Sequence, residues 1–323
     1  MIESTVDPAI SEGARSAGLD PRGIWCGHDA DGVVRAWPAD AARALGVDAL
    51  VAHGRVRATS MLEPVRREPA HRAEMITEVR GGERLTGLLR RGDWWVIAGE
   101  DGYVGWIHDW VVAEVDDEAV GSWLGRYALP HGTLWIADHH AGVPLVMGTP
   151  LFRPDTDLVA RADWRLVRTP TGQEGWIPAD TIEATTDPSV AALLRRARSL
   201  LGVPYRWGGR SPLGFDCSGF VQFVFALGGH VLPRDASQQQ GVGRAVALDR
   251  DQWQAGDVLF FGDPADHVGI FDGRSSMIHC RGSVVKQRLD SVEALLERLS
   301  DVRRIGPTES VDAALGWIRP AEA

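Results

Sequence analysis

The apolar residues of the last third of the chain recur with two different periods. In two segments they return every three or four positions, which predicts amphipathic helices. The first helix follows Asp187-Pro188, an N-cap and a first-turn proline, and ends at Gly202. Its apolar positions are Val190, Leu193, Leu194, Ala197, Leu200 and Leu201. The second helix begins at or just after Cys217, and its apolar positions are Phe220, Phe223, Val224 and Leu227.

Short apolar runs further along the chain predict strands. Asp257–Phe261 and His267–Phe271 are two such runs, and Asp272-Gly273 after the second is typical of a hairpin turn. A third strand-like run, Met277–Cys280, comes next. Together with the two helices, these strands predict an α+β domain.

The first half of the chain contains an internal repeat with an offset of seventy residues. Three blocks recur in register: Arg91–Trp94 as Arg161–Trp164, Trp95–Ile97 as Arg165–Val167, and Gly102–Ile107 as Gly172–Ile177. Each copy predicts a strand, a polar turn and a short strand ending in Gly-Trp-Ile. Alternating apolar residues between Gly and Asp favour two small β-barrels, over residues 60–115 and 130–185.

These patterns divide the chain into three predicted domains. Residues 1–120 hold an N-terminal elaboration and the first barrel, residues 121–185 the second barrel, and residues 186–323 the α+β domain. Within residues 1–58 we expect a strand at Gly32–Trp37 and a short helix at Asp40–Leu45, ending at Gly46. We assign no function to this segment. Ala313–Ala323 is expected to be a loosely packed tail.

Composition narrows the class of protein. With 44% hydrophobic and 24% charged residues, the chain is typical of a folded globular protein. A formal charge of −10 without a Lys/Arg cluster argues against nucleic acid as a partner. Three scattered cysteines are too few for a disulfide framework or a metal site.

The ends and the apolar segments bear on cellular location. Met1–Asp7 has neither a basic region nor an apolar run, so no Sec-type signal peptide is expected. No segment approaches the roughly 20 apolar residues of a membrane span. We therefore expect a cytoplasmic protein, although a chain trimmed of its leader would look the same.

Cys217, His267 and His279 form a candidate catalytic set. A thiol in the first turn of a helix lies at the positive end of the macrodipole, which favours the thiolate. His267 enters a later strand, where it can pair with the thiolate and then protonate a leaving amine. His279 follows twelve positions later, and a hairpin can bring it beside His267 to orient the ring. Taken singly, each is more often a core or surface residue; together they indicate acyl transfer through a thioester.

This segment resembles the NlpC/p60 family of cell-wall cysteine peptidases over nearly all of residues 190–308. Six motifs carry the resemblance, in family order: Tyr205–Gly209, Asp216–Gly219, Leu232–Asp235, Gly256–Phe261, His267–Ile270 and Ile278-His279. The resemblance implies a papain-like core with Cys217 as nucleophile, His267 as base and His279 as third member. It also implies that the Tyr205 hydroxyl and the backbone N–H of Cys217 polarise the scissile carbonyl.

The two repeats resemble bacterial SH3-like domains, and the whole arrangement resembles the γ-D-glutamyl-L-diamino acid endopeptidases that trim muropeptides, cytoplasmic recycling forms included. The resemblance implies that one barrel covers the cleft and helps to recognise the free N-terminal L-alanine of a stem peptide. The family's tyrosine for this role matches Tyr103, and the second copy has Gln173 there. Only the first barrel is therefore expected to touch substrate. The competing interpretation is that Tyr103 packs in the barrel core.

Charged and hydroxyl side chains complete the expected substrate site. Asp216 is expected to bind the substrate ammonium group, with Glu78 or Glu83 as a second charge. Arg234 either binds the free carboxylate of D-glutamate or closes a salt bridge within the protein. Ser218 and Ser237 are expected to add hydrogen bonds.

Other interpretations stay open at this point. The domain could be a papain-like amidase or acyltransferase acting on another substrate, or a cell-wall binding protein that has lost catalysis. No metal or cofactor is expected, because His139-His140 lack further ligands at plausible spacing. Trp94, Trp106, Trp164 and Trp176 are assigned to the barrel cores because they recur in the repeat. The expected substrates are murein tripeptides or tetrapeptides; the sequence leaves open lysine or diaminopimelate, and the oligomeric state.

Overall fold

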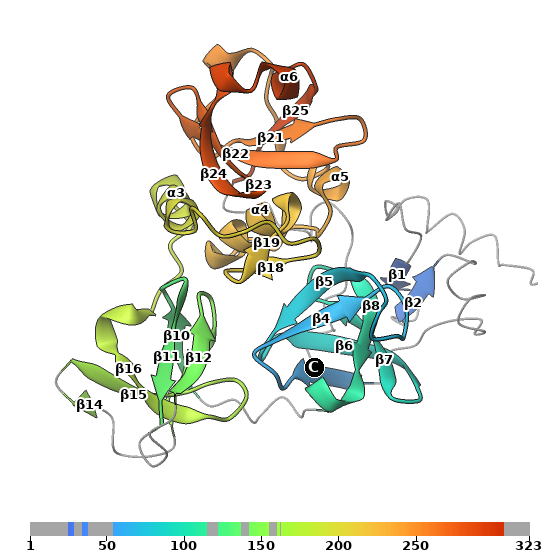
Figure 1. Ribbon diagram of the computed structural model, residues 1–323, viewed down its shortest axis with the longest axis vertical. Coiled ribbons are helices and arrows are strands. Elements are labelled where there is room, and N and C mark those ends of the chain that lie inside the picture. Colours follow the sequence, from blue (N-terminus) through green and yellow to red (C-terminus); the bar gives the residue numbers. More distant parts are fainter. Residues whose placement is uncertain are drawn as a thin grey trace, which may run out of the picture.

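A computed structural model describes residues 25–28, 34–37, 54–114, 122–136, 142–154, 160–161 and 163–306. In these residues two β-rich domains precede a mixed C-terminal domain (Figure 1). We call them the first β domain (54–114), the second β domain (122–183) and the C-terminal domain (190–304). The helix predicted at Asp40–Leu45, the pair His139-His140 and the tail from Ala313 lie outside the described residues.

The first β domain is a seven-stranded antiparallel sheet in the order β5-β4-β8-β7-β6-β3-β9. Its strands are β3 (Gly54–Ala58), β4 (Leu62–Arg66), β5 (Met75–Arg80), β6 (Arg84–Arg91), β7 (Trp94–Gly99), β8 (Val104–His108) and β9 (Val112–Glu114), with the 3-10 turn η1 (Asp109–Val111). Val65, Ile97 and Ile107 lie at its buried centre. Ahead of it, β1 (Trp25–His28) pairs with β2 (Val34–Trp37), so the strand predicted at Gly32–Trp37 is confirmed for its last four residues.

The second β domain repeats the hairpin of the first at the offset seen in the sequence. Its elements are β10 (Trp123–Tyr127), β11 (His131–Trp135), β12 (Gly142–Val146), β13 (Pro150–Phe152), β14 (Ala160–Arg161), β15 (Trp164–Arg168), β16 (Glu174–Pro178), η2 (Ala179–Thr181) and β17 (Ile182–Glu183). The strand order is β12-β11-β16-β15-β13-β10-β17, and β14 pairs with β15. Hairpin β15–β16 corresponds to β7–β8, and Val167 and Ile177 take the buried places of Ile97 and Ile107.

The repeated tryptophans do not all enter a core. Trp106 is buried, at 4% exposure. Trp164 is 39% exposed, because residues of opposite parity along β15 point to opposite faces and Val167 takes the inner one. The assignment of all four tryptophans to the cores is therefore wrong for Trp164, and Trp94 and Trp176 are only half-buried.

The C-terminal domain combines helices with a six-stranded sheet in the order β20-β25-β21-β22-β23-β24. Its strands are β18 (Arg210–Ser211), β19 (Gly214–Phe215), β20 (Arg244–Ala245), β21 (Val258–Phe261), β22 (His267–Gly273), β23 (Ser276–Arg281), β24 (Ser283–Arg288) and β25 (Leu299–Arg304). Its helical elements are α3 (Val190–Ser199), α4 (Cys217–Leu227), α5 (Ala236–Gln239), η3 (Arg250–Gln252), η4 (Leu289–Ser291) and α6 (Glu293–Leu296). The structure thus confirms the α+β class, both predicted helices and the predicted strands.

The predicted turn after β22 is displaced by two residues. Arg274 and Ser275 both have positive φ and form the turn between β22 and β23. Asp272 is instead buried within the strand, where Arg198 and Lys286 neutralise its carboxylate. The two counter-charges come from other elements, which explains why the local Asp-Gly pattern placed the turn too early.

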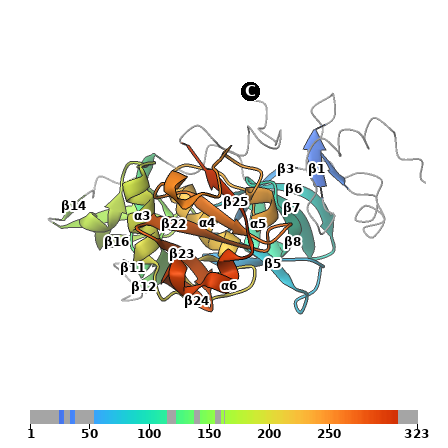
Figure 2. The same ribbon diagram turned by 90° about the horizontal axis from the view of Figure 1, so that it is seen from above.

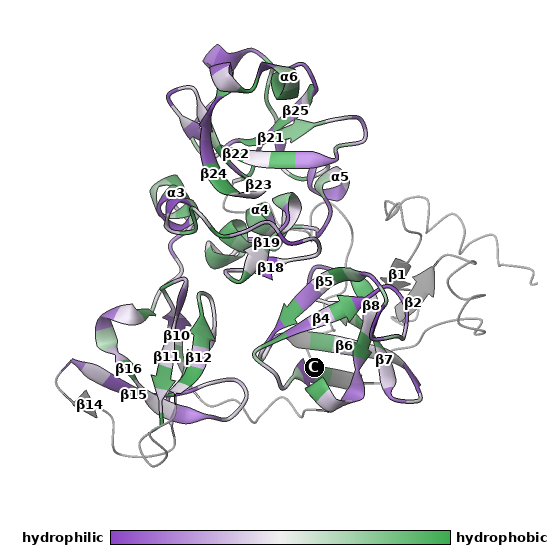
Figure 3. Ribbon diagram, in the orientation of Figure 1, coloured by the Kyte–Doolittle hydropathy of each residue, from purple (hydrophilic) through white to green (hydrophobic). Residues whose placement is uncertain are grey.

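Helix α4 is the centre of the molecule. It packs against β22 and β23 on one side, and the two β domains lie to either side of it (Figures 1 and 2). Apolar residues predominate along α4 and β21 (Figure 3), and Phe220, Val221 and Val224 are fully buried. In the described part of the chain, no helix is long and apolar enough to span a membrane.

Candidate active site

Cys217 is the first residue of α4. Asp216 caps the helix, and its Oδ1 accepts the N–H of Gly219 at 2.7 Å. Gly219 allows the turn to pack closely, because a Cβ there would lie 2.1 Å from the carbonyl oxygen of Gly209. The thiol of Cys217 is 8% exposed and lies 3.9 Å from the carbonyl oxygen of Asp266, next to His267. Capping and close packing therefore hold the thiol at the entrance to β22.

Strands β22 and β23 bring His267 and His279 together. Gly269 faces His279 across the sheet, and a Cβ on Gly269 would lie 2.9 Å from that of His279. The absence of a side chain at Gly269 lets the two imidazoles meet. His267 Nε2 lies 2.7 Å from His279 Nδ1.

Gln287 of β24 extends this contact into a relay. Its Oε1 lies 2.6 Å from His279 Nε2. An amide oxygen only accepts, so His279 donates from Nε2 and accepts at Nδ1, and His267 donates from Nε2. Nδ1 of His267 is then the nitrogen available for a proton from the thiol. The chain His267–His279–Gln287 therefore sets the tautomer of the candidate base.

Burial keeps both reacting groups neutral. Burial raises the pKa of the Cys217 thiol to about 12, and the Asp216 carboxylate adds to the rise, while the N–H groups of Ser218 and Val268 and the charge of Arg234 act against it. Burial, followed by His279, lowers the pKa of His267 to about 4. The expectation of a resting thiolate is therefore wrong, because desolvation and Asp216 outweigh the helix end.

Tyr205 stands beside the thiol. Its side chain is 37% exposed, and burial together with the nearby Cys217 raises the pKa of its hydroxyl to about 12. The hydroxyl is thus protonated at neutral pH and can donate a hydrogen bond. The N–H of Cys217, in the first turn of α4, precedes the helical hydrogen-bond pattern and is a second donor of this kind.

Asp216 and Arg234 form a buried ion pair behind the thiol. The Arg234 guanidinium, 1% exposed, donates to both Asp216 oxygens, at 3.0 and 2.5 Å, and to Ser218 Oγ at 3.0 Å. Asp216 also accepts the N–H of Gly208 at 2.9 Å. Arg234 therefore closes a salt bridge and does not face the cleft, and Asp216 is engaged inside the protein. The assignments of Arg234 to a substrate carboxylate and of Asp216 to a substrate amine are corrected accordingly.

Tyr103 reaches across to the C-terminal domain. Its hydroxyl donates to the Asp235 carboxylate at 3.2 Å, and the ring is buried at 5% exposure in the core of the first β domain. The ring of Tyr103 therefore packs in the core of the first β domain, while its hydroxyl contacts the C-terminal domain. The two interpretations of Tyr103, core packing and a role at the cleft, do not exclude each other. Asp235 caps α5, which also carries the half-buried Ser237.

The two candidate acids of the first β domain are both paired with arginine. Glu78 is 1% exposed and accepts the backbone N–H of Arg210 at 2.9 Å and the side chain of Arg206 at 3.3 Å. Glu83 pairs with Arg80 at 2.6 Å and with Arg210. Neither carboxylate is left to bind a substrate amine, so the expectation of one such acid is corrected. They join the two domains instead.

Five of the predicted site residues line one of two hollows, three of them the first and two the second. A cavity of about 80 Å³ between the first β domain and the C-terminal domain is lined by residues that include Glu78, Glu83 and Tyr103. An open cleft of about 530 Å³, the catalytic cleft, lies on the C-terminal domain. Its lining residues are Tyr205, Asp266, His267, Cys280, Arg281, Gly282, Ala294, Leu295 and Arg298.

Comparison with known families agrees with this geometry. Residues 202–304 match the model of the NlpC/P60 family, and residues 65–109 match a model described as the bacterial dipeptidyl-peptidase Sh3 domain. The C-terminal domain is an NlpC/P60 domain. The first β domain is a bacterial SH3 domain, and the second is an SH3-like repeat of it.

Two curated relatives place the NlpC/P60 domain among named peptidases. The chain is 33% identical over 145 residues to "Dipeptidyl-peptidase 6" of Lysinibacillus sphaericus, across 42% of this chain and 52% of that protein. It is 28% identical over 229 residues to "Gamma-D-glutamyl-L-lysine dipeptidyl-peptidase" of Bacillus cereus, across 63% and 66%. The chain thus spans about half to two thirds of the length of these relatives.

A solved structure supports the arrangement of the domains. An NlpC/P60 family protein from Bacillus cereus aligns with 78% of this chain and 99% of its own, at a TM-score of 0.68 and 22% sequence identity. At this identity the likeness speaks for the fold alone. That fold includes the SH3-like domains ahead of the NlpC/P60 domain.

Two residues of the NlpC/P60 domain escaped the sequence reasoning. Gln287 lies in an alternating strand where its face, and hence its contact with His279, is decided by the register with β23. Asp235 lies in the motif Leu232–Asp235, but nothing in the sequence shows that it meets Tyr103, which is 132 positions away. Among the described residues no cluster of three or more His, Cys, Asp and Glu is arranged to hold a metal ion.

Proposed function

We propose that the protein is a cysteine endopeptidase that hydrolyses the γ-D-glutamyl–L-diamino acid bond of murein stem peptides. The observation that carries the proposal is the relay of His267, His279 and Gln287 beside the thiol of Cys217. The name of the Bacillus cereus relative, gamma-D-glutamyl-L-lysine dipeptidyl-peptidase, supports the choice of bond.

The first chemical step is attack of the Cys217 sulfur on the γ-carbonyl carbon of D-glutamate. Because both groups are neutral at rest, His267 Nδ1 takes the thiol proton as the C–S bond forms. The carbonyl oxygen becomes an oxyanion, which the Tyr205 hydroxyl and the Cys217 N–H stabilise. The new imidazolium is stabilised by His279, which accepts from its Nε2–H.

Collapse of this intermediate breaks the C–N bond. His267 returns the proton to the departing amine of the diamino acid, and the dipeptide stays on Cys217 as a thioester. Water, deprotonated by His267, then attacks the thioester carbonyl. The C–S bond breaks, His267 returns the proton to the Cys217 sulfur, and the dipeptide is released as a carboxylic acid. Each proton thus passes through one ring nitrogen, whose tautomer the relay holds.

Recognition of the substrate amine is assigned to Asp235 and Tyr103. Asp235 is partly exposed, lies one residue after the buried Arg234, and takes the hydroxyl of Tyr103 from the SH3 domain. An ionised carboxylate accepts several hydrogen bonds at once, so an ammonium group can bind Asp235 together with the Tyr103 hydroxyl. A requirement for a free amine would confine the activity to peptides already released from the glycan, the substrate pool of murein recycling in the cytoplasm.

Mass spectrometry of L-Ala-γ-D-Glu-L-Lys incubated with the full chain tests the proposal, beside the same peptide acetylated at its N-terminus. We expect release of L-Ala-D-Glu from the free peptide alone. Cys217→Ala should abolish release, whereas Arg288→Gln, which removes an exposed arginine of β24 that pairs with Asp290 outside the cleft, serves as the control. Cleavage by Cys217→Ala would sink the proposal.

Equal cleavage of the free and acetylated peptides would keep the peptidase and remove Asp235 and Tyr103 as readers of the amine. No cleavage of either, with Cys217 still open to alkylation, would favour an acyltransferase or amidase with another substrate.

A further inference from the structure

The catalytic cleft contains a positive charge that the proposed chemistry does not use. All the residues that line the cleft come from the NlpC/P60 domain. Its two arginines differ in their surroundings. Arg298 is neutralised by Asp266, at 2.6 Å. Arg281 is exposed, and among the residues that the structure describes no side chain pairs with it.

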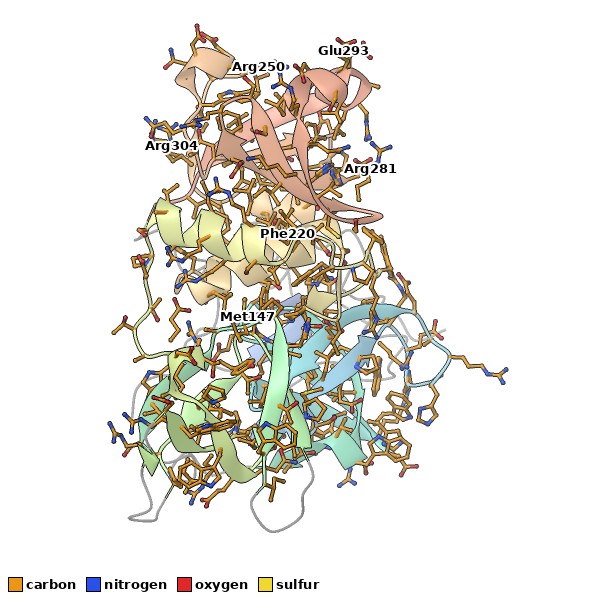
Figure 4. The ribbon with its side chains drawn as sticks, turned by 60° about the vertical axis from the view of Figure 1, so that its left-hand side comes forward. Met147, Phe220, Arg250, Arg281, Glu293 and Arg304 are labelled. Atoms are coloured by element: carbon orange, nitrogen blue, oxygen red, sulfur yellow. The ribbon has the colours of Figure 1, made fainter. Side chains whose placement is uncertain are left out.

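Arg281 is placed by the same strand that places the relay. It is the last residue of β23, two positions after His279, and alternate residues of a strand point to the same face. Figure 4 shows Arg281 at one edge of the NlpC/P60 domain, between the levels of Phe220 and Glu293. The positive charge of Arg281 also acts on His267. It lowers the pKa of His267, as the third cause after burial and His279.

The position of Arg281 indicates which half of the substrate it contacts. The SH3 domain, with Tyr103, meets the NlpC/P60 domain at Asp235, where the proposed function places the N-terminal amine. Among the described residues, none of the SH3 domain lines the catalytic cleft, so the cleft is available to the other half, which leaves as the diamino acid. An unpaired guanidinium in that half fits a carboxylate, with which it can form two parallel hydrogen bonds.

We propose that Arg281 binds a carboxylate of the amino acid that leaves from the C-terminal side of the scissile bond. This inference rests on the proposed function and deepens it. The carboxylate has two possible sources, the α-carboxylate of a C-terminal residue or a carboxylate on the side chain of the diamino acid. Because the cleft carries the charge of Arg281 beside a neutralised Arg298, it selects anionic leaving groups over purely cationic ones.

The first test compares substrates that differ only in charge. The peptide L-Ala-γ-D-Glu-L-Lys is offered as the free acid and as the C-terminal amide, and the diaminopimelate peptide is offered with its side-chain carboxylate free or amidated. Arg281→Gln should lower kcat/KM for the carboxylate that it reads roughly 10- to 100-fold and leave the matching amide little changed. Each peptide is compared as its acid and its amide. The peptide for which Arg281→Gln abolishes the preference for the acid over the amide shows which carboxylate Arg281 binds.

Two further variants control this result. Arg281→Lys keeps the charge and should retain part of the preference for the acid. Arg288→Gln removes an exposed arginine of β24 that pairs with Asp290 outside the cleft, and should change nothing. An equal loss on acid and amide after Arg281→Gln would overturn the proposal, because Arg281 would then act on the histidines alone.

A second readout does not depend on peptide cleavage. Cys217 is alkylated with iodoacetate, which carries a carboxylate, and with iodoacetamide, which does not, and the modified thiol is identified by peptide mapping. We expect Arg281→Gln to lower the ratio of the iodoacetate rate to the iodoacetamide rate, and Arg288→Gln to leave this ratio unchanged.

The two readouts separate the two proposals. A lower ratio without cleavage of any peptide would reject the proposed function and keep the carboxylate site. An unchanged ratio would overturn the carboxylate site whether or not the peptides are cleaved.

Discussion

The two β domains share one hairpin and differ in how they meet the NlpC/P60 domain. Hairpins β7–β8 and β15–β16 begin at equivalent positions and bury equivalent residues, Ile97 and Val167 among them. The backbone of the repeat is therefore conserved between the copies. What differs is the set of side chains on the surfaces that face α4 and its surroundings.

The first β domain docks through charge and hydrogen bonds. Besides the pairs of Glu78 with Arg206 and of Glu83 with Arg210, Arg234 donates to Thr77 Oγ1 at 2.9 Å and Gln222 donates to Asp101 at 2.8 Å. These contacts lie between residues more than a hundred positions apart. They place the first copy next to the cap of α4, where the nucleophile is.

Among the described residues, the second β domain docks through apolar packing and two polar contacts. Met147, 4% exposed, belongs to the same apolar cluster as Leu193 and Phe223 of the NlpC/P60 domain (Figure 4). One ion pair, Glu183 with Arg196 at 2.6 Å, accompanies it. This copy lies against the C-terminal end of α4, away from Cys217, so its contacts stabilise the fold and do not reach the nucleophile.

One pair of equivalent residues summarises the difference. Tyr103 sends its hydroxyl to Asp235, whereas Gln173, seventy positions later, stays within its own turn, where its Oε1 accepts from Thr171 at 3.0 Å. A shared backbone thus does not imply a shared role. The side chain at the tip of the hairpin decides which copy reaches the catalytic domain.

The largest expected effect comes from removing a charged contact between the first β domain and the NlpC/P60 domain. Arg210→Met removes the guanidinium that pairs with Glu83 across the interface, which should lower the free energy of unfolding by about 3–5 kcal/mol. Urea denaturation followed by tryptophan fluorescence measures the loss. The control is Arg126→Met in the second β domain, where the guanidinium donates to the carbonyl oxygen of Leu227 at 3.4 Å. It should cost roughly 1 kcal/mol, and equal losses would show that the two interfaces do not differ.

A smaller effect is expected at the tips of the two hairpins. Tyr103→Phe keeps the packed ring and removes its hydrogen bond to Asp235, so kcat/KM for a peptide with a free amine should fall roughly 10- to 100-fold. The rate of Cys217 alkylation should stay the same. Gln173→Leu, at the matching place of the second copy, should leave both rates unchanged. If Gln173→Leu has an effect as large as Tyr103→Phe, the two copies do not have separate roles.

The smallest expected effect is on the stability of the protein at acidic pH. Burial by itself would raise the pKa of Glu83, but Arg210 and Arg80 outweigh it and hold that pKa below its ordinary 4.5. Glu83 therefore contributes stability above pH 4.5, and this contribution is lost as the pH falls further. Burial raises the pKa of Asp101, whose contribution runs the other way and is lost as the pH rises above its ordinary 3.8.

The measurement is thermal unfolding between pH 3 and pH 6. Glu83→Gln should lose less stability toward pH 3 than the unchanged protein, while Glu174→Gln, which removes a surface pair with Arg168 in the second β domain, should follow the unchanged protein. Parallel curves for all three proteins would mean that Glu83 does not report on the first interface.

Local patterns in the sequence were sufficient for the elements and for the order of the catalytic residues. Helix α4 begins at Cys217, where the apolar period predicts it, because helical spacing and an N-cap act within a few residues. The even spacing of His267 and His279 anticipates their contact, because side chains in strands alternate with a period of two. The repeat also predicts the second hairpin at its observed start.

The tertiary structure decided which charges meet and which groups ionise. With 34 basic and 44 acidic residues, a sequence offers many possible partners for Arg234 or Glu83, and only the packed chain brings one of them within bonding distance. The same holds for Gln287, whose place beside His279 depends on strand register. Burial likewise leaves Cys217 a neutral thiol, since desolvation depends on what surrounds a group in space and not on its neighbours along the chain.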